Sequence, residues 1–339
     1  MSVRPSIVPE EVDAAWRFFL VNWIGIGAFG AVLACSLLLT DFSIELAGLA
    51  IAICYIGLYA GFAHANARSP RRRDPQVMFV LGGTAQIVLL TAVMTPLTYV
   101  VAATDFPMQD ASLLGIDRAL GLDWAAYVGY VDAHPALAAV MNCGYAMIRW
   151  PIFAIPVVLA AMGRYRRIEE FTFAFGLALF VTTLISGLVP AIGVYQEIGL
   201  DPATLKHIDP GAYLDQLRDL PPTRAGILRH LELLNLGGIV TFPSFHAASA
   251  ALYTWALWPL RWSRPFVVVV NGIMLAATPL NGGHYFVDVI AGVAIAVSAI
   301  VVARHAGRVI ARLQFAPRQD GLGLPAPMPA PIRAIVPAE

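Results

Sequence analysis

Charged residues are scarce in this chain, and cysteines are few and unpaired. Only 13% of its 339 residues are charged, whereas soluble domains carry about 25%. The 22 basic residues balance the 22 acidic ones, so net charge gives no reason to expect a nucleic acid or another polyanion as partner. Cys35, Cys54 and Cys143 lie in apolar runs without paired spacing. We therefore expect small core residues there rather than disulfides or a zinc site.

Long apolar runs take the place of the missing charge. The chain is 58% hydrophobic with a mean hydropathy of +0.70, and several runs approach the roughly 20 residues that cross a bilayer. No short apolar run followed by a cleavage site opens the chain, so we expect the first span to be retained. These features predict an all-α, polytopic membrane protein with about eight transmembrane helices. The predicted spans are 18–40, 44–66, 77–103, 137–162, 170–195, 245–262, 265–281 and 284–305.

Arginine placement predicts the orientation of these spans. The clusters follow the second, fourth, sixth and eighth spans: Arg68, Arg71, Arg72 and Arg73; Arg164, Arg166 and Arg167; Arg261 and Arg264; Arg304, Arg308 and Arg312. All four fall on one side, which the positive-inside rule assigns to the cytoplasm together with both termini. Without an organelle signal, this favours a bacterial inner membrane with the opposite face in the periplasm; a Golgi-like lumen is the alternative.

Two short stretches place a histidine at the start of an apolar helix. One is Thr241-Phe-Pro-Ser-Phe-His246, and the other is Asn281-Gly-Gly-His-Tyr-Phe-Val-Asp288. Positions i and i+4 share a helix face, so the His284 imidazole and the Asp288 carboxylate can touch. The 38 residues between the two histidines allow one crossing and one return. Both histidines are therefore predicted at the same, non-cytoplasmic face.

Small and helix-capping residues accompany the histidines. Ser244 can cap the helix that contains His246, which leaves backbone N–H groups free for an anion. Gly282 and Gly283 let the backbone approach a ligand before His284. A carboxylate that orients one imidazole beside a second imidazole suits nucleophilic phosphoryl transfer. A lone interfacial histidine is usually just a solvated polar residue, but this set of costly polar groups in a membrane chain indicates a function.

At this point the chain resembles a family. Pro243-Ser-Phe-His246 followed by His284-Tyr-Phe-Val-Asp288 looks like the paired motifs of the membrane-bound type 2 phosphatidic acid phosphatase superfamily. The residues within these motifs are similar to those of its inositol phosphorylceramide synthase-like branch. The resemblance covers residues from about 110 to 305. It implies a six-helix phosphatase-type core and a phosphohistidine intermediate, with no metal and no other cofactor.

The resemblance also implies roles for matching positions. His284 would attack phosphorus, and Asp288 would orient His284 and stabilise its positive charge. His246 would protonate the leaving alcohol and then act as a base toward the acceptor. Ser244 and Gly283 would help to hold the phosphate.

Two departures from the family pattern concern the positive charge that phosphoryl transfer needs. Thr278 stands where the motif arginine is expected, six residues before His284, and the Lys-x-x-x-x-x-x-Arg-Pro motif is not recognisable. We favour Arg224 as the replacement, because Thr223-Arg-Ala-Gly resembles an arginine-glycine segment upstream of the first histidine motif in this branch. Arg149, within the fourth predicted span, is the second candidate. The outer loop offers further cations at Lys206, Arg218 and Arg229.

These expectations divide the chain into four parts. Residues 1–17 form a cytoplasmic segment and 18–103 contain three accessory spans. Residues 104–313 form the catalytic core, with an outer loop at 196–243 and an amphipathic interfacial helix near 109–131. The Pro/Ala-rich tail, 314–339, is expected to be disordered.

Three functions remain in view. The first is a lipid phosphatase or phosphotransferase, in which water or an alcohol such as inositol or a sugar accepts the phosphoryl group; the sequence does not distinguish these acceptors. The second is a metal-dependent membrane hydrolase that uses His246, His284 and Asp288 as ligands. The third is a non-catalytic transporter or scaffold, against which stands the lack of Pro/Gly-broken spans in matching positions of two halves.

Overall fold

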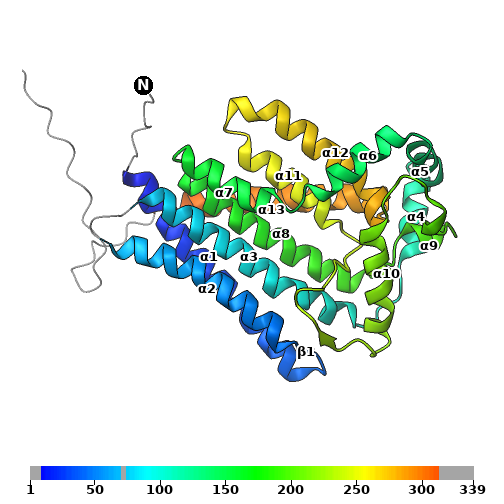
Figure 1. Ribbon diagram of the computed structural model, residues 1–339, viewed down its shortest axis with the longest axis horizontal. Coiled ribbons are helices and arrows are strands. Elements are labelled where there is room, and N and C mark those ends of the chain that lie inside the picture. The colour runs from blue at the N-terminus through cyan, green and yellow to red at the C-terminus, as the bar shows by residue number, and fades with distance from the viewer. Residues whose placement is uncertain (1–8, 70–73, 313–339) are drawn as a thin grey trace, which may run out of the picture.

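The computed structural model describes residues 9–69 and 74–312. Long helices lie side by side along the longest axis of the molecule, and shorter helices gather at one end (Figure 1). The described part contains one sheet, in which β1 (Ser43–Ile44) pairs in parallel with β2 (His230–Leu231). The protein is therefore an all-α, polytopic membrane protein, as the composition predicted.

Six helices in the described ranges are long and apolar enough to cross a membrane. They are α1 (Pro9–Leu39), α2 (Leu46–Arg68), α3 (Pro75–Ala102), α8 (Tyr165–Leu188), α12 (Arg264–Gly282) and α13 (Phe286–Arg312). The eight predicted spans differ from this result at two places, 137–162 and 245–262. All the other predicted spans correspond to one of these helices.

The predicted span 137–162 is broken. It consists of α6 (Pro135–Ala146) and α7 (Pro151–Ala161), which are bent by 67°. Pro151 contributes to the break locally, because it has no N–H to continue the hydrogen bonding of α6 and instead takes the first position of α7, where no N–H is needed. Tyr253 donates a hydrogen bond of 2.9 Å to the carbonyl of Ile148 in the break. This bond satisfies a backbone carbonyl that would be costly to leave without a hydrogen bond inside a membrane.

The predicted span 245–262 is shorter than a crossing. Helix α11 (Phe245–Leu257) has 13 residues, so it is about 20 Å long at 1.5 Å per residue, against a hydrocarbon thickness of about 30 Å. The short 3-10 helix η2 (Arg261–Ser263) then leads into α12. Helix α11 runs from Ser244, beside His284, toward the basic end of the bundle, where η2 follows it.

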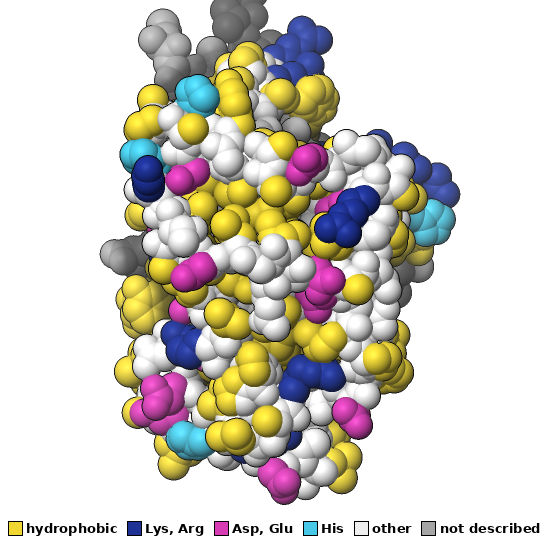
Figure 2. All heavy atoms as spheres, turned by 90° about the vertical axis from the view of Figure 1, so that its right-hand side faces the viewer, with side chains coloured by type: hydrophobic (Ala, Val, Ile, Leu, Met, Phe, Trp, Pro, Cys, Tyr) yellow, Lys and Arg dark blue, Asp and Glu magenta, His cyan; other side chains and the backbone are white. Residues whose placement is uncertain are grey.

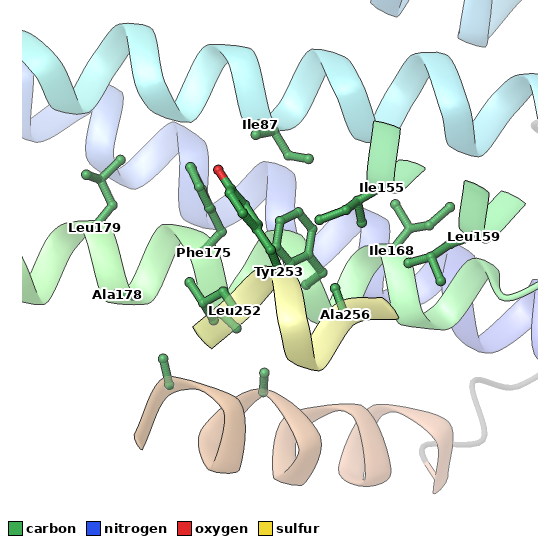
Figure 3. Close-up of a cluster of buried hydrophobic side chains, with 14 of the residues drawn as sticks. Ile87, Ile155, Leu159, Ile168, Phe175, Ala178, Leu179, Leu252, Tyr253 and Ala256 are labelled. Carbon is green, nitrogen blue, oxygen red and sulfur yellow. The ribbon is translucent and has the colours of Figure 1, made fainter. Parts of the chain in front are cut away.

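The main core lies between α3, α7, α8 and α11. Ile87, Ile155, Leu159, Phe175 and Tyr253 point toward one another from these four helices (Figure 3). Helix α13 closes the core with alanines, which allow close helix approach. The expectation that the cysteines are core residues is wrong. All three are exposed on the outside of the helices that carry them, where a membrane protein meets lipid.

Basic residues meet at the end of the bundle opposite the histidines. Arg166 and Arg167 pair with the carboxylate of Glu170 on α8 at 3.3 and 3.4 Å. Arg304 of α13 acts electrostatically on the same carboxylate, and Gly307 lies directly against it. This grouping agrees with the predicted topology, and the cytoplasmic location of this end stays a prediction.

Short helices cover the other end of the bundle. The interfacial helix expected near 109–131 is two helices, because Gly121 turns the chain at a φ of +74° and Asp123 caps the second helix. Acidic, basic and apolar side chains are interspersed over this end (Figure 2). The elements are α4 (Asp110–Ala119), α5 (Trp124–Asp132), α9 (Val194–Glu197), η1 (Pro202–Thr204) and α10 (Gly211–Arg224). The tail expected to be disordered, 314–339, lies outside the described residues.

Candidate active site

The His284 imidazole and the Asp288 carboxylate are in contact in the buried turn that opens α13. Nδ1 of His284 lies 3.2 Å from Oδ2 of Asp288, and the side chains are 4% and 0% exposed. The backbone N–H of Tyr285 donates to the same carboxylate oxygen at 2.9 Å. A carboxylate on Nδ1 favours the tautomer that carries its proton there. Nε2 of His284 is then left with a free lone pair.

Ser244 joins this turn to the start of α11. Its hydroxyl oxygen caps the helix by accepting the Ala247 N–H at 3.3 Å, and it lies 3.4 Å from Nε2 of His284. The Ser244 backbone N–H donates to the carbonyl of Asp288 at 3.1 Å. The free nitrogen of His284 therefore points at a helix N-terminus, where unpaired N–H groups and the helix dipole favour an anion.

His246 is the second residue of α11 and is stacked on Tyr145. The two rings are nearly parallel, with centroids 4.1 Å apart, and the tyrosine hydroxyl lies 3.5 Å from Nδ1 of His246. The same hydroxyl is close to His284, because a Cβ atom on Gly282 would lie 2.9 Å from it and 3.1 Å from Nε2 of His284. Tyr145 thus contacts His246 and has its hydroxyl near His284, and the two imidazoles interact electrostatically.

Arg149 lies in the break between α6 and α7. Its guanidinium acts electrostatically on His246 and on Tyr145. Tyr145 is the second-last residue of α6, and Arg149 follows it by four residues in the stretch between α6 and α7.

The comparisons with known proteins agree with this geometry. A sequence model of the PAP2 superfamily matches residues 111–302, which is more than half of the chain. The chain belongs to the PAP2 superfamily. No curated protein and no protein of solved structure matches the chain. Membership of the PAP2 superfamily identifies a membrane enzyme of the phosphatase type, and the contacts above lie within the matched residues.

Arg224, the cation favoured from the sequence, is engaged elsewhere in this PAP2 superfamily member. Its guanidinium donates to the carbonyls of Thr104 and Phe106 at 2.9 and 2.7 Å, and to that of Ala102 at 3.4 Å. It lines a cavity of about 410 Å³ with residues of α4, α9 and α10, and neither histidine lines that cavity. Thr278 is uncharged and cannot replace the motif arginine. Its buried hydroxyl donates a hydrogen bond to the backbone carbonyl of Met274.

Gly283 has a packing role in addition to the one expected. Its φ is +64°, and a Cβ atom there would lie 2.5 Å from the ring of Tyr213 and 3.1 Å from that of Tyr195. Its carbonyl accepts the N–H of Val194 at 2.8 Å. Only glycine fits both this backbone conformation and this space. Tyr213 of the outer loop thus lies directly against the turn that contains His284.

Two buried aspartates of α4 contact the turn that follows His284, and neither was a candidate site residue from the sequence. Asp117 accepts the N–H groups of Phe286 and Val287, and Asp110 accepts the hydroxyl of Tyr285. The two acids are 0% and 6% exposed. Their spacing of seven residues on an amphipathic helix was the available signal, because it puts both on one face.

Proposed function

We propose that the chain is an integral membrane enzyme that cleaves a lipid phosphate ester through a phosphohistidine on His284. The contact series from Ser244 through His284 to Asp288, with His246 beside it, is the observation that carries this proposal. It supplies a nucleophile, a group that orients the nucleophile and a second imidazole for proton transfer, which are the parts that nucleophilic catalysis requires.

In the first step, the Nε2 lone pair of His284 attacks phosphorus and the bond from phosphorus to the ester oxygen breaks. The leaving oxygen takes a proton from the His246 imidazolium and departs as an alcohol. Asp288 stabilises the positive charge that forms on the His284 ring through its contact with Nδ1. The products of this step are the free alcohol and a phosphorylated His284.

In the second step, His246 removes a proton from the incoming acceptor. The acceptor oxygen attacks phosphorus, the bond from phosphorus to Nε2 breaks, and His284 returns to its starting state. Water as acceptor releases phosphate, and an alcohol receives the phosphoryl group. Similarity of the motifs to the inositol phosphorylceramide synthase-like branch favours an alcohol such as inositol.

The phosphate oxygens need donors and positive charge in this scheme. The hydroxyl of Ser244 and the first N–H groups of α11 lie on the side of His284 that carries Nε2, and the guanidinium of Arg149 acts electrostatically on His246 in the same helix. We therefore assign phosphate binding to Ser244 and Arg149. Arg224, with its three carbonyl partners, is proposed to hold the outer loop instead.

The depth of the site supports a lipid substrate. Ser244, at the start of α11, lies against His284, between the end of α12 and the start of α13, so the site is at one end of the apolar helices, where the phosphate of a lipid is expected. The basic clusters at the opposite end favour a periplasmic or lumenal location for the site. We propose the bacterial inner membrane, with both termini in the cytoplasm.

The contacts favour this function over its two alternatives. In a two-histidine, one-carboxylate metal site all three side chains would point at a common centre, but the Asp288 carboxylate binds the ring edge of His284 that faces away from Ser244. A transporter built from repeats would show broken spans in matching positions. The described residues contain one broken pair, α6 with α7.

The test uses the purified protein and a panel of lipid phosphates labelled with ³²P, supplied with and without polyols. Label is expected in free phosphate or in a phosphorylated polyol, and transiently in acid-labile form on His284. His284→Ala should abolish both signals while the protein still inserts. His246→Ala should accumulate phosphorylated His284 when the leaving group is good. Turnover by His284→Ala, or activity lost to a chelator, would contradict the proposal.

A further inference from the structure

The start of α13 is capped by a side chain from another helix. Asp117 of α4 accepts the N–H of Phe286 through Oδ2 and the N–H of Val287 through Oδ1, both at 2.8 Å. These are the first two N–H groups of α13, directly after His284 and Tyr285. A buried carboxylate on them replaces the water or local cap that a helix N-terminus otherwise needs.

Asp110, two turns earlier on α4, holds the other side of the same turn. One of its carboxylate oxygens accepts the N–H of Gly193 at 2.9 Å and the Tyr285 hydroxyl at 2.9 Å. The next residue, Val194, donates its N–H to the carbonyl of Gly283. The residues before and after His284 are thus both connected to α4, one through the loop at 192–194 and the other directly.

Asp117 is also an acid next to the pair of His284 and Asp288. Burial raises the pKa of its carboxyl group, and the hydrogen bonds from Phe286 and Val287 oppose that rise. No ion pair reaches it within the part of the chain that the structure describes. It acts electrostatically on Asp288. A fully buried acid without a basic partner is costly, so packing alone does not explain its presence beside a turn that must stabilise a cationic imidazole.

We propose that Asp117 is a positioning residue for the transfer reaction, acting through the start of α13 to fix the His284 ring against Ser244, with Asp110 holding the preceding side of the turn. This inference rests on the proposed function of His284. The interfacial helix α4 is then part of the catalytic apparatus rather than only a membrane contact. Substrate binding by Arg149 and the start of α11 does not involve this helix.

The experiment compares Asp117→Asn, Asp117→Ala and Asp117→Glu with Asp123→Asn in the full chain. Asp123 is a matched control, because its carboxylate also caps a helix by accepting a backbone N–H, that of Ala126 at 2.9 Å, but at the exposed start of α5. Asp117→Asn retains one acceptor oxygen and loses the charge. We expect kcat to fall about tenfold in Asp117→Asn and about 10²-fold in Asp117→Ala, with KM within twofold, partial recovery in Asp117→Glu and no change in Asp123→Asn.

A second measurement needs no substrate. The rate at which diethyl pyrocarbonate modifies His284, followed by mass spectrometry, reports how firmly the turn encloses the ring. Asp117→Asn should raise this rate several-fold, and Asp123→Asn should leave it unchanged. Unchanged kcat and unchanged modification in a folded Asp117→Asn protein would overturn the inference. A wild-type protein without a phosphoenzyme would instead overturn the proposed function, and the modification rates would still decide the role of Asp117.

Discussion

Gly292 on α13 lies directly against the backbone carbonyl oxygen of Ser244 on α11. A Cβ atom at this position would overlap that oxygen and would also come within 3.1 Å of the Ala247 side chain and 3.2 Å of the Ala248 nitrogen. Gly292 follows Asp288 by one helical turn. The missing side chain therefore allows the approach of two helices that places Ser244 beside the His284 ring.

Gly292→Ala should consequently disable the site without removing any catalytic group. The added methyl group must push α13 away from the start of α11, and a misplacement of about 1 Å costs on the order of 10²-fold in rate. Phosphate release or transfer, measured on protein that is monodisperse in detergent, checks this. Gly272→Ala is the matched control, since nothing lies within 4 Å of its added Cβ atom. Equal activity in the two variants would show that the helix approach does not control the chemistry.

The two candidate phosphate-binding arginines should behave differently. Arg149→Ala removes the guanidinium that acts on His246 and should lower kcat/KM by about 10²- to 10³-fold, with little effect on thermal stability. Arg224→Ala removes three hydrogen bonds to the carbonyls of the connection after α3 and should mainly lower the melting temperature. Activity assays paired with thermal unfolding separate the two effects. An inactive but fully stable Arg224→Ala protein, beside an active Arg149→Ala protein, would reverse the assignment.

The parts of the site that were predictable from the sequence are local in the chain. The contact of His284 with Asp288 follows from their i, i+4 spacing, and the cap by Ser244 follows from its place before an apolar helix. The common face of the two histidines followed from counting one crossing and one return. Each of these inferences uses a periodicity that a few residues already determine.

The remaining features depend on contacts between distant segments. Asp117 meets Val287 across 170 residues. Its seven-residue spacing from Asp110 puts both acids on one helix face, but the spacing does not indicate what that face contacts. The break after Tyr145 was marked by Arg149 and Pro151 within an apolar run, but hydropathy averaged over that run predicted one continuous span. The partners of Arg224 are carbonyl groups, which every residue has, so the sequence carries no signal for them.

Tyr145→Phe should affect the role of His246 more than substrate binding. The substitution keeps the ring that stacks on the imidazole and removes the hydroxyl 3.5 Å from Nδ1. We expect kcat to fall about tenfold while KM stays within twofold, since this long hydrogen bond only helps to orient the ring. Tyr145→Ala also removes the stacking and should lose more.

Leaving-group dependence provides the control for Tyr145. A substrate whose leaving group needs no proton should restore most of the activity of Tyr145→Phe, because protonation by His246 is then unnecessary. An equal loss with both substrates would show that the tyrosine acts on something other than proton transfer.

The outer loop is fastened to α5 by one carboxylate whose ionisation should control loop stability. Asp132 accepts the backbone N–H groups of Lys206, His207 and Ile208 at 2.8 to 3.1 Å. Burial raises the pKa of this carboxyl group, but the three hydrogen bonds outweigh burial and hold the pKa below its ordinary value. An acid whose pKa is lower in the folded state stabilises that state above its unfolded pKa, which is about 4. The stabilisation is lost as the pH falls through the folded value.

Asp132→Asn should therefore lower the melting temperature at pH 7, and the difference from wild type should shrink as the pH falls below about 4. The asparagine keeps one acceptor oxygen but cannot bind three N–H groups with a negative charge, so charge-assisted bonds become weaker neutral ones. Thermal unfolding of both proteins between about pH 3 and pH 7 measures this. Asp123→Asn, at an exposed cap with a single N–H partner, should show a smaller difference at every pH. A gap between Asp132→Asn and wild type that stays constant over this range would mean that packing around the side chain, rather than its charge, holds the loop.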